Sequence, residues 1–164
     1  MARKPDFAEM TATQIRAHRE TVFLRLLNSA AQRETVELVT RLAAAGYDDV
    51  QMSYVPLLAN VDTEGTRIIT ISQRTGNTRQ AVSQLVSEIE ARGYVERVPD
   101  PNDGRAVLVR HTARGRALLA RALGEMSDIE ARYARALGRT RFESLKQLLH
   151  DLERAEQPGG SFGR

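Results

Sequence analysis

The sequence predicts a mainly α-helical fold with one small β-hairpin and long helices at both ends. Apolar residues recur at helical spacing over residues 13–45 and again over residues 112–157. Between these segments lie shorter helical patterns and one pair of alternating, strand-like segments joined by a dense turn. With 164 residues and an apolar fraction of 41%, the chain has the size of one domain that buries a core.

The first long helical segment follows a polar arm. Residues 1–12 are polar and include Pro5, so they are predicted to form a loose arm. Residues 13–45 contain no proline or glycine, which predicts one long helix or two helices joined near Asn28. Gly46 is predicted to end this segment, because glycine readily adopts the left-handed conformation that stops a helix.

A shorter helix, a strand and a third helix are predicted next. Residues 47–51 are predicted to form a turn and residues 52–61 a short helix, in which Pro56 bends the helix or marks its first turn. Residues 67–69 are predicted to form a short strand that pairs with a later hairpin. Thr70 is then expected to cap the following helix.

A turn at Gly76 and Asn77 separates that helix from a second helix with two distinct faces. Thr78 can cap the free amides of its first turn, and Gly93 can supply the left-handed stop after Arg92. Apolar residues at helical spacing form the inward face, namely Val82, Leu85, Val86 and Ile89. Together the two helices and their turn predict a helix-turn-helix unit.

The outward face of this second helix carries hydrogen-bonding side chains and, before Glu88, no acid. We interpret it as a surface that reads the DNA major groove, because arginine can pair with guanine and glutamine with adenine. The candidate DNA-contacting residues on this face are Thr78, Arg79, Gln80, Ser83 and Gln84. An ordinary solvent-exposed helix face would show the same polar character.

A β-hairpin with a charged tip follows the helix. Residues 94–98 and 106–110 alternate in the manner of strands, and residues 99–104 form a dense turn cluster. Such a hairpin beside a helix-turn-helix unit is a wing. Arg105 is predicted to enter the adjacent minor groove of DNA, with Asp103 orienting its guanidinium. The alternative for these two residues is a solvated ion pair of little energetic weight.

Two further helices are predicted after the wing. Thr112 can cap a long helix that Gly124 interrupts without stopping and that Gly138 ends. Residues 140–143, Thr-Arg-Phe-Glu, match a capping box that would start the last helix. Apolar stripes run along both helices, formed by Leu119, Ala122, Met126, Ile129, Tyr133 and Leu137 on the first and by Phe142, Leu145, Leu148, Leu149 and Leu152 on the second.

Composition narrows the classes of function. The chain has no cysteine, and His18, His111 and His150 lie far apart, so neither a metal site nor a cofactor is expected. No glycine-rich phosphate loop or nucleophile motif occurs, so an enzyme is not expected. Nothing resembles a signal peptide or a membrane span, which predicts a cytoplasmic protein. Residues 67–116 contain nine arginines against five acids, an excess that suits a module that binds a polyanion.

Together these motifs resemble the MarR family of winged helix-turn-helix transcription regulators. The resemblance covers about residues 66–120, and it is carried by Gly93-Tyr94-Val95, Asp103-Gly104-Arg105 and Thr112-Ala113-Arg114-Gly115. The chain departs from the family at Thr75 and Asn77, where an apolar residue is usual, at Gly104, where a second basic residue is usual, and at His111, where leucine is usual. We interpret His111 as a neutral, hydrogen-bonded core residue rather than a pH-sensing or metal-binding one.

The resemblance implies a homodimer in which interleaved terminal helices hold two winged modules apart. The chain then divides into an N-terminal arm and dimerisation helix (1–46), a winged helix-turn-helix DNA-binding module (47–111), C-terminal dimerisation helices (112–157) and a flexible tail (158–164). Such a dimer would bind double-stranded DNA at a pseudo-palindromic operator, with recognition helices about 34 Å apart. The alternative is that the terminal helices close a monomeric core.

The resemblance also implies a repressor that is released by a small, often aromatic, effector. The ligand would bind between the terminal helices and the DNA-binding module and favour a dimer with the wrong spacing. Candidate ligand-binding residues are Tyr47, Met52, Tyr54 and Arg67, although aromatic residues at such positions more often belong to the core. The competing hypothesis is a winged-helix protein-interaction module without DNA binding, which the polar recognition face disfavours.

Overall fold

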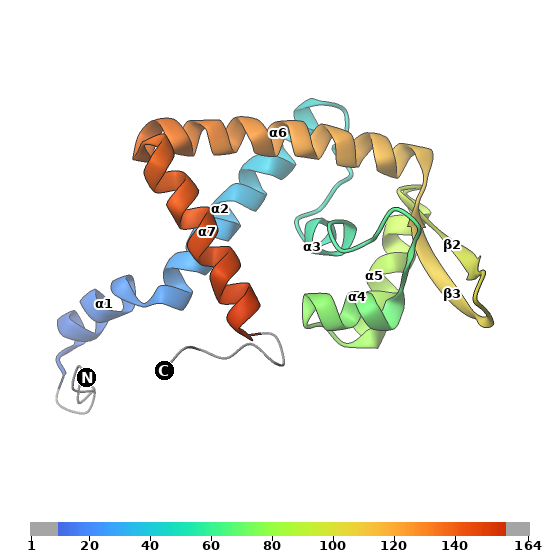
Figure 1. Cartoon of the computed structure of the whole chain (residues 1–164), viewed down its shortest axis with the longest axis horizontal. Coiled ribbons are helices and arrows are strands. Elements are labelled where there is room, and N and C mark those ends of the chain that lie inside the picture. The colour runs from blue at the N-terminus through green and yellow to red at the C-terminus, as the bar shows by residue number, and fades with distance from the viewer. Residues whose placement is uncertain (1–9, 157–164) are drawn as a thin grey trace.

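A winged module of short helices and strands lies at one side of the molecule, and long helices from both ends of the chain lie at the other (Figure 1). The structure is a computed structural model that describes residues 10–156. Most of these residues are helical, and a single three-stranded antiparallel sheet has the strand order β1-β3-β2. This architecture confirms the predicted fold class, a mainly α-helical chain with a small β-hairpin wing.

The N-terminal helical segment consists of two helices, α1 (Ala12–Thr21) and α2 (Phe23–Ala44). The break between them lies at Val22, so the predicted joint near Asn28 is wrong. Val22 has an extended backbone, which a β-branched side chain favours, whereas the polar side chain of Asn28 is solvent-exposed within an unbroken helix. Gly46 follows α2 with a positive φ of 91°, as predicted for the residue that ends the segment.

The next elements are shorter than predicted. Helix α3 (Tyr54–Leu58) has five residues, and strand β1 (Thr66–Arg67) has two. Helix α4 (Ile68–Thr75) begins directly after the strand, so the prediction that Thr70 caps this helix is wrong. The change from strand to helix occurs at Arg67, whose extended backbone lets the chain pair with the wing and enter the helix without a loop.

Helix α5 (Arg79–Ala91) has the predicted boundaries. The Thr78 hydroxyl accepts a hydrogen bond from the Ala81 amide (3.2 Å), which confirms the predicted cap. Gly76 and Gly93 have positive φ angles of 69° and 75° and end α4 and α5, respectively. The inward stripe of α5 faces the core, because Val82, Val86 and Ile89 are buried and Leu85 is half-buried.

The wing consists of strands β2 (Val95–Asp100) and β3 (Asp103–His111), which pair antiparallel from Val95↔His111 toward the tip. Strand β1 pairs with the opposite edge of β3, in the register Thr66↔Val109, as expected from the sequence. The connection is tighter than the predicted turn over residues 99–104, because only Pro101 and Asn102 lie between the strands. Pairing therefore continues to the tip, with one irregularity of register between Pro99 and Asp100.

Two helices complete the chain, α6 (Ala113–Leu137) and α7 (Arg139–Glu156). The Thr112 hydroxyl accepts from the Gly115 amide (3.0 Å), and Gly138 ends α6, both as predicted. The predicted capping box at residues 140–143 is wrong, because α7 already begins at Arg139 and Thr140 lies inside it. The predicted flexible tail at 158–164 lies outside the described residues, as does most of the predicted N-terminal arm.

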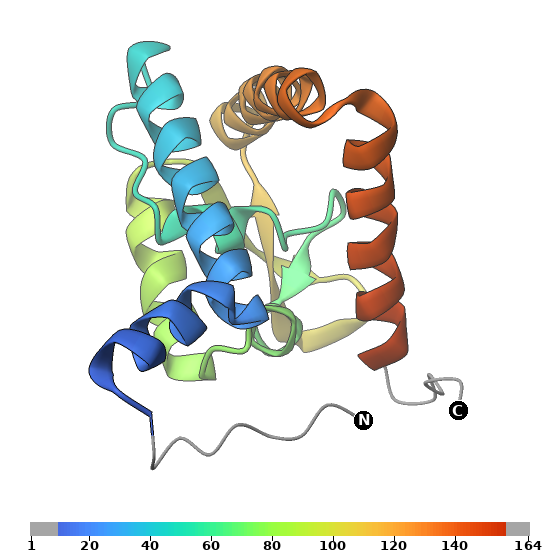
Figure 2. The same ribbon diagram turned by 90° about the vertical axis from the view of Figure 1, so that its left-hand side faces the viewer.

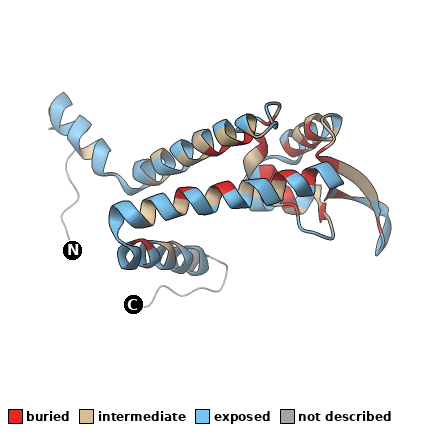
Figure 3. Ribbon diagram, turned by 90° about the horizontal axis from the view of Figure 1, so that it is seen from above, coloured by how far each residue is buried: buried red, intermediate tan, exposed pale blue. Residues whose placement is uncertain are grey.

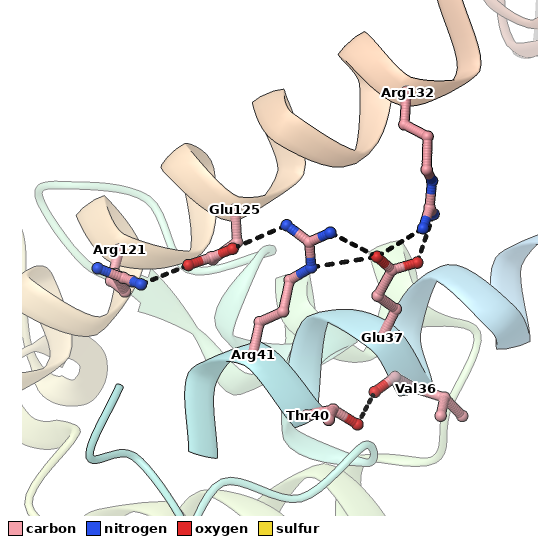
Figure 4. A network of polar contacts seen from close by, with 7 residues as sticks. All are labelled: Val36, Glu37, Thr40, Arg41, Arg121, Glu125 and Arg132. Carbon is pink, nitrogen blue, oxygen red and sulfur yellow. Dashed lines mark hydrogen bonds and ion pairs between the residues drawn. The ribbon is translucent and has the colours of Figure 1, made fainter. Parts of the chain in front are cut away.

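Helices α2 and α6 cross and are joined by a chain of ion pairs (Figure 4). Glu37 of α2 accepts hydrogen bonds from Arg132 of α6 and from Arg41. Arg41 in turn donates to Glu125 of α6 (3.1 Å), which also pairs with Arg121. Hydrogen bonds with these arginines hold the pKa values of both glutamates below their usual range. The carboxylates therefore stay charged near neutral pH, and the crossing of α2 over α6 is fixed by several interactions at once.

Large apolar side chains remain exposed on the terminal helices. Helix α7 packs mainly against α6, through contacts such as Phe142 with Tyr133 (6.1 Å between ring centroids). Although α7 overlaps α2 in Figure 1, Figure 2 shows the two helices on opposite sides of the molecule. Buried positions concentrate in the winged module and on one face of α6, whereas α1 and α7 are mostly exposed (Figure 3). The exposed apolar residues include Phe23, Leu24, Leu26, Val36, Leu145, Leu148 and Leu152.

Two glycines of α6 have opposite surroundings. A Cβ atom at Gly115 would lie 1.9 Å from the backbone oxygen of Tyr94, because the start of α6 packs directly on the base of the wing. At Gly124, the same atom would meet nothing within 4 Å. Only Gly115 is therefore required by packing.

We expect Gly115→Ala to lower the free energy of unfolding by about 1 to 3 kcal/mol, since either the wing or the helix must shift. Gly124→Ala, on the same helix, is the matched control and should raise it by about 0.5 to 1 kcal/mol, because alanine loses less backbone entropy in a helix. Urea unfolding of both variants measures the two effects. Equal effects of the same sign would contradict the close approach at Gly115.

Candidate nucleic-acid interface

The outward face of α5 is exposed and free of acid in its first turn. Thr78, Arg79, Gln80 and Gln84 are all exposed, and Ser83 is half-buried. The amino end of a helix also carries partial positive charge from its free amides, which favours a nearby phosphate. The start of α5 thus combines long side chains that can pair with base edges and backbone amides that can bind phosphate.

Arg97 of β2 joins the wing to helix α5. Its guanidinium pairs with Glu90 of α5, and it donates to the Ser83 carbonyl (3.2 Å) and the Ser87 hydroxyl (3.0 Å). The Arg97 amide also donates to Glu90 (3.0 Å). Strand β2 and helix α5 are therefore held together by several polar bonds, so that the wing has a defined position beside the outward face of α5.

The tip of the wing is anchored through a buried carboxylate. Asp100 is 5% exposed and accepts from Asn102 (2.9 Å) and from the Arg67 Nε atom (2.7 Å). The backbone hydrogen bond from Asn102, followed by that from Arg67, holds the pKa of Asp100 below its usual range. A charged, fully bonded Asp100 fixes the turn on which the tip depends.

The predicted contact between Asp103 and the Arg105 guanidinium is not present. Asp103 instead accepts from the backbone amide of Arg105 (3.2 Å), and its other oxygen lies 3.5 Å from an Arg67 nitrogen. Asp103 therefore shapes the turn, because its position two residues before Arg105 suits a bond to the backbone. The Arg105 side chain is exposed and left free to contact a ligand.

Most arginines of the module already have partners. Of the nine between residues 67 and 116, five form ion pairs, namely Arg67, Arg74, Arg97, Arg110 and Arg114. Arg92 stacks over Tyr54, and Arg116 donates to the His111 carbonyl (2.9 Å). Within residues 10–156, only Arg79 and Arg105 of the nine have side chains without such a contact. These two are the arginines that the sequence singled out for DNA contact.

The four predicted ligand-binding residues do not line one cavity. Tyr54 is fully buried, and Tyr47 packs beside Tyr94 with 6.4 Å between ring centroids. Met52 is 42% exposed, and Arg67 is bound to the wing tip. Their proposed role in binding an effector stays a prediction.

An apolar cavity of about 180 Å³ lies instead between α2, α3 and α6. None of the four predicted residues lines it. Sequence reasoning missed this cavity because its walls are ordinary core side chains drawn from distant segments, with no distinctive local pattern. Its lining consists of Leu38, Leu42, Val50, Val55, Leu58, Ala59, His111, Gly115, Leu118, Leu119, Ala122, Leu123 and Met126.

His111 closes this cavity at the base of the wing. It is the last residue of β3 and is 4% exposed. Neither ring nitrogen has a partner at good hydrogen-bond geometry, and the hydrogen bonding predicted for this core histidine is limited to weaker contacts with the backbone carbonyls of Val61 and Leu58. Burial lowers the pKa of His111, an effect that the nearby carbonyls of Val61 and Leu58 oppose and that Arg116 reinforces. The ring is therefore neutral at physiological pH, as predicted.

Other classes of site find no support in the described residues. Within residues 10–156, no three His, Asp or Glu side chains gather in a group that could hold a metal ion. None of the helices in this part of the chain combines the length and apolar character that crossing a bilayer requires.

A model of the MarR family matches residues 48–106. The match confirms the family resemblance seen in the sequence, although it lies nearer the N-terminus than the predicted extent of about 66–120. The family consists of transcription regulators and not of enzymes, in agreement with the absence of catalytic motifs. No curated protein sequence matches this chain.

Solved structures of MarR-family regulators share the fold. CouR from Rhodococcus jostii RHA1, bound to p-coumaroyl-CoA, has a TM-score of 0.67 at 22% identity over 88% of this chain and 97% of its own. A mutant MarR from E. coli in complex with operator DNA has a TM-score of 0.65 at 22% identity over 82% and 96%. A MarR-family transcriptional regulator from Rhodococcus sp. RHA1 gives 0.64 at 22% over 78% and 89%.

The buried His111 predicts a pH-dependent stability. Its pKa in the folded chain lies below the ordinary value of 6.5, so protonation favours the unfolded chain. As the pH falls from 7.5 to 5.5, the wild-type protein should therefore lose free energy of unfolding relative to His111→Leu, by up to about 1.4 kcal/mol per pH unit. Urea unfolding at several pH values measures this difference. His150→Leu, at an exposed position of α7, should keep the wild-type profile, and parallel profiles for all three proteins would contradict the assignment.

Proposed function

We propose that this chain is a homodimeric, sequence-specific DNA-binding transcription regulator that acts as a repressor. The match of a MarR-family model to residues 48–106 supports the proposal. The observation that carries the proposal is the freedom of Arg79 and Arg105. One lies on the outward face of α5 and the other at the tip of the wing, and both lack the partners that occupy the other arginines of the module.

In the proposed complex, α5 enters the major groove and the wing lies along an adjacent minor groove. Thr78, Arg79, Gln80, Ser83 and Gln84 then face base edges or phosphates, and Arg105 enters the minor groove. Asp103 contributes indirectly, because it holds the backbone at Arg105 in the turn. The structure of a mutant E. coli MarR complexed with operator DNA supports DNA binding by the shared fold.

The proposed dimer uses the terminal helices, with residues 1–46 and 112–157 as the association region and 47–111 as the DNA-binding module. The exposed apolar residues of α2 and α7 support it, since a second copy would cover a surface that α6 leaves open. A two-fold pair of winged modules would read a pseudo-palindromic operator.

We further propose that a small molecule controls the spacing of the two modules. The apolar cavity lies between the terminal helices and α3, so a ligand there would touch both parts of the chain. CouR bound to p-coumaroyl-CoA supports ligand binding by this fold. A ligand that binds more tightly to the dimer whose spacing does not fit DNA would weaken DNA binding. The size of the effect depends on the ratio of the ligand's affinities for the two forms of the dimer.

Operator discrimination tests the groove assignment. An operator is first selected from a random DNA pool with the wild-type protein. Arg79→Ala and Gln84→Ala should each lose about 1 to 3 kcal/mol of specific binding and relax the base preference, because each removes a contact to a base edge. Titration at fixed salt measures both.

Arg141→Ala, which removes an equal charge from exposed helix α7, is the matched control and should keep the wild-type preference. If Arg79→Ala leaves discrimination unchanged, the assignment of α5 to the major groove is wrong. If the wild-type protein shifts no DNA even at low salt, the protein-interaction hypothesis is favoured instead.

The association of two chains can be tested at the exposed stripe. Leu148 is 62% exposed and Leu24 is 65% exposed, so Leu148→Glu and Leu24→Glu should leave the isolated chain folded but place charge in the proposed interface. Sedimentation should show monomers, and affinity for the full operator should fall at least tenfold. Gln147→Glu, at a polar exposed position of α7, should remain dimeric. Monomeric wild-type protein would refute the dimer.

A further inference from the structure

The tip of the wing lies in an irregular part of the hairpin. Figure 1 shows the hairpin extending away from the helices at one side of the module. The pairing of β2 with β3 shifts after Pro99, and within this hairpin, which lies wholly in the described part of the chain, residues 104–106 of β3 have no partner on β2. The regular pairing thus stops short of Arg105, so the segment that carries this arginine depends on other bonds.

Two aspartates at the tip bond to the same arginine from outside the hairpin. Arg67 of β1 donates from Nε to Oδ2 of Asp100 (2.7 Å), and its Nη2 atom lies 2.6 Å from the same oxygen. This Nη2 atom also lies 3.5 Å from Oδ2 of Asp103. Among residues 10–156, no other side chain from outside the hairpin bonds to either aspartate. Arg67 is therefore the side-chain connection between the tip and the rest of the module.

The second oxygen of each aspartate holds a backbone amide of the tip. Oδ1 of Asp100 accepts from the Asn102 amide (2.9 Å), and Oδ1 of Asp103 accepts from the Arg105 amide (3.2 Å). Each carboxylate thus bonds to Arg67 through one oxygen and to the tip backbone through the other. Since Asp100 is 5% exposed, loss of Arg67 would also leave a buried charge with one partner fewer.

The backbone of Arg67 is in turn fixed on the helix-turn-helix unit. Arg67 directly precedes α4, and the hydroxyl of its neighbour Thr66 donates to Asp62 (3.0 Å). Asp62 also accepts from Arg74 of α4 (2.8 Å). A displacement of α4 would therefore move Arg67 and, through the two aspartates, the tip of the wing.

We propose that Arg67 is a positioning residue for DNA binding, which holds the wing tip so that Arg105 enters the minor groove at a fixed place relative to α5. The inference rests on the proposed function, because it needs Arg105 to contact DNA. Arg67 itself does not contact DNA in this role, which differs from the ligand binding expected from the sequence. Base preference beneath the wing then depends on a residue that touches no base.

The alternative is a direct bond from Arg67 to a phosphate, since its side chain is 42% exposed. The two roles require different chemistry. A lysine can replace arginine at a single phosphate oxygen, but it lacks the planar set of nitrogens that Arg67 directs at the two aspartates. Arg67→Lys therefore separates the two roles, because it keeps the positive charge and loses this geometry.

Titration of the operator selected with the wild-type protein, at fixed salt, measures the effect on affinity. We expect Arg67→Lys to weaken binding by about fivefold and Arg67→Ala by at least about tenfold. In an Arg105→Ala background, either substitution should change the affinity by less than about twofold, because the arginine that Arg67 positions is then absent. Wild-type affinity of Arg67→Lys, or effects that multiply in the double variants, would overturn the proposal.

Arg110→Ala is the matched control for the loss of charge. Arg110 lies on the same hairpin, is 45% exposed and pairs with Glu96 (2.9 Å) rather than with the tip. It should change the affinity by the same factor with and without Arg105, because the two side chains act independently. A factor that depends on Arg105 would show that loss of any charge on the hairpin has this effect, and would overturn the special role of Arg67.

Selection of bound DNA from a random pool gives a readout that a general loss of stability would not produce. Arg67→Lys should relax the base preference at the positions that Arg105→Ala relaxes, and should keep the preference that Arg79→Ala loses. An equal loss of preference at all positions would overturn an action through the wing.

Hydrogen exchange in the free protein tests the connection without DNA. The amides of Asn102 and Arg105 should exchange at least about threefold faster in Arg67→Lys than in the wild-type protein, and Arg110→Ala should keep the wild-type rates. Unchanged rates in Arg67→Lys would overturn the proposal. If the wild-type protein selects no DNA, the proposed function fails together with the role of Arg67 in DNA binding, whereas faster exchange would still show that Arg67 holds the tip.

Discussion

The close approach of the Gly115 backbone to Tyr94 fixes how the DNA-binding module is attached to the long helix α6. Around this contact, the Thr112 amide donates to the Tyr94 carbonyl (3.1 Å), and the Thr112 hydroxyl donates to the Gly93 carbonyl (2.5 Å). Arg114 stacks on the Tyr94 ring at 4.4 Å and pairs with Asp49. The Tyr94 hydroxyl also donates to Asp49, and burial followed by this bond raises its pKa to about 12. The wing, the loop after α2 and the start of α6 therefore meet at one rigid joint.

The elements that local chemistry determines were the ones that the sequence could predict. Helix α5 and the start of α6 depend on threonine caps and a left-handed glycine, which are visible within a few residues. The break at Val22 and the start of α7 at Arg139 carry no such signal, because neither position has a capping side chain or a glycine. The cavity around His111 could not be predicted from local patterns either, since its lining residues are spread over the chain from Leu38 to Met126.

The charge of the module illustrates a second limit of sequence reasoning. An excess of arginine over acid suggested a polyanion-binding surface, but ion pairs within the fold occupy most of those side chains. Arg97, for example, holds β2 on α5 through Glu90 and is not available to a ligand. What distinguishes the candidate interface is therefore the identity of the unpaired arginines rather than the total charge. The helix and wing patterns indicated Arg79 and Arg105, and the contacts in the fold show that the other arginines of the module have partners.

The exposed apolar side of α7 affects how such a regulator would respond to its own concentration. This helix packs mainly on α6 and keeps a row of leucines in contact with water. In the proposed dimer, the second copy covers these leucines. Association of the two chains and burial of the apolar side of α7 therefore occur together. Dilution below the dissociation constant of the dimer would then separate the two winged modules and expose the leucines in the same step. The concentration of the protein in the cell would thus determine whether the dimer forms and binds the operator.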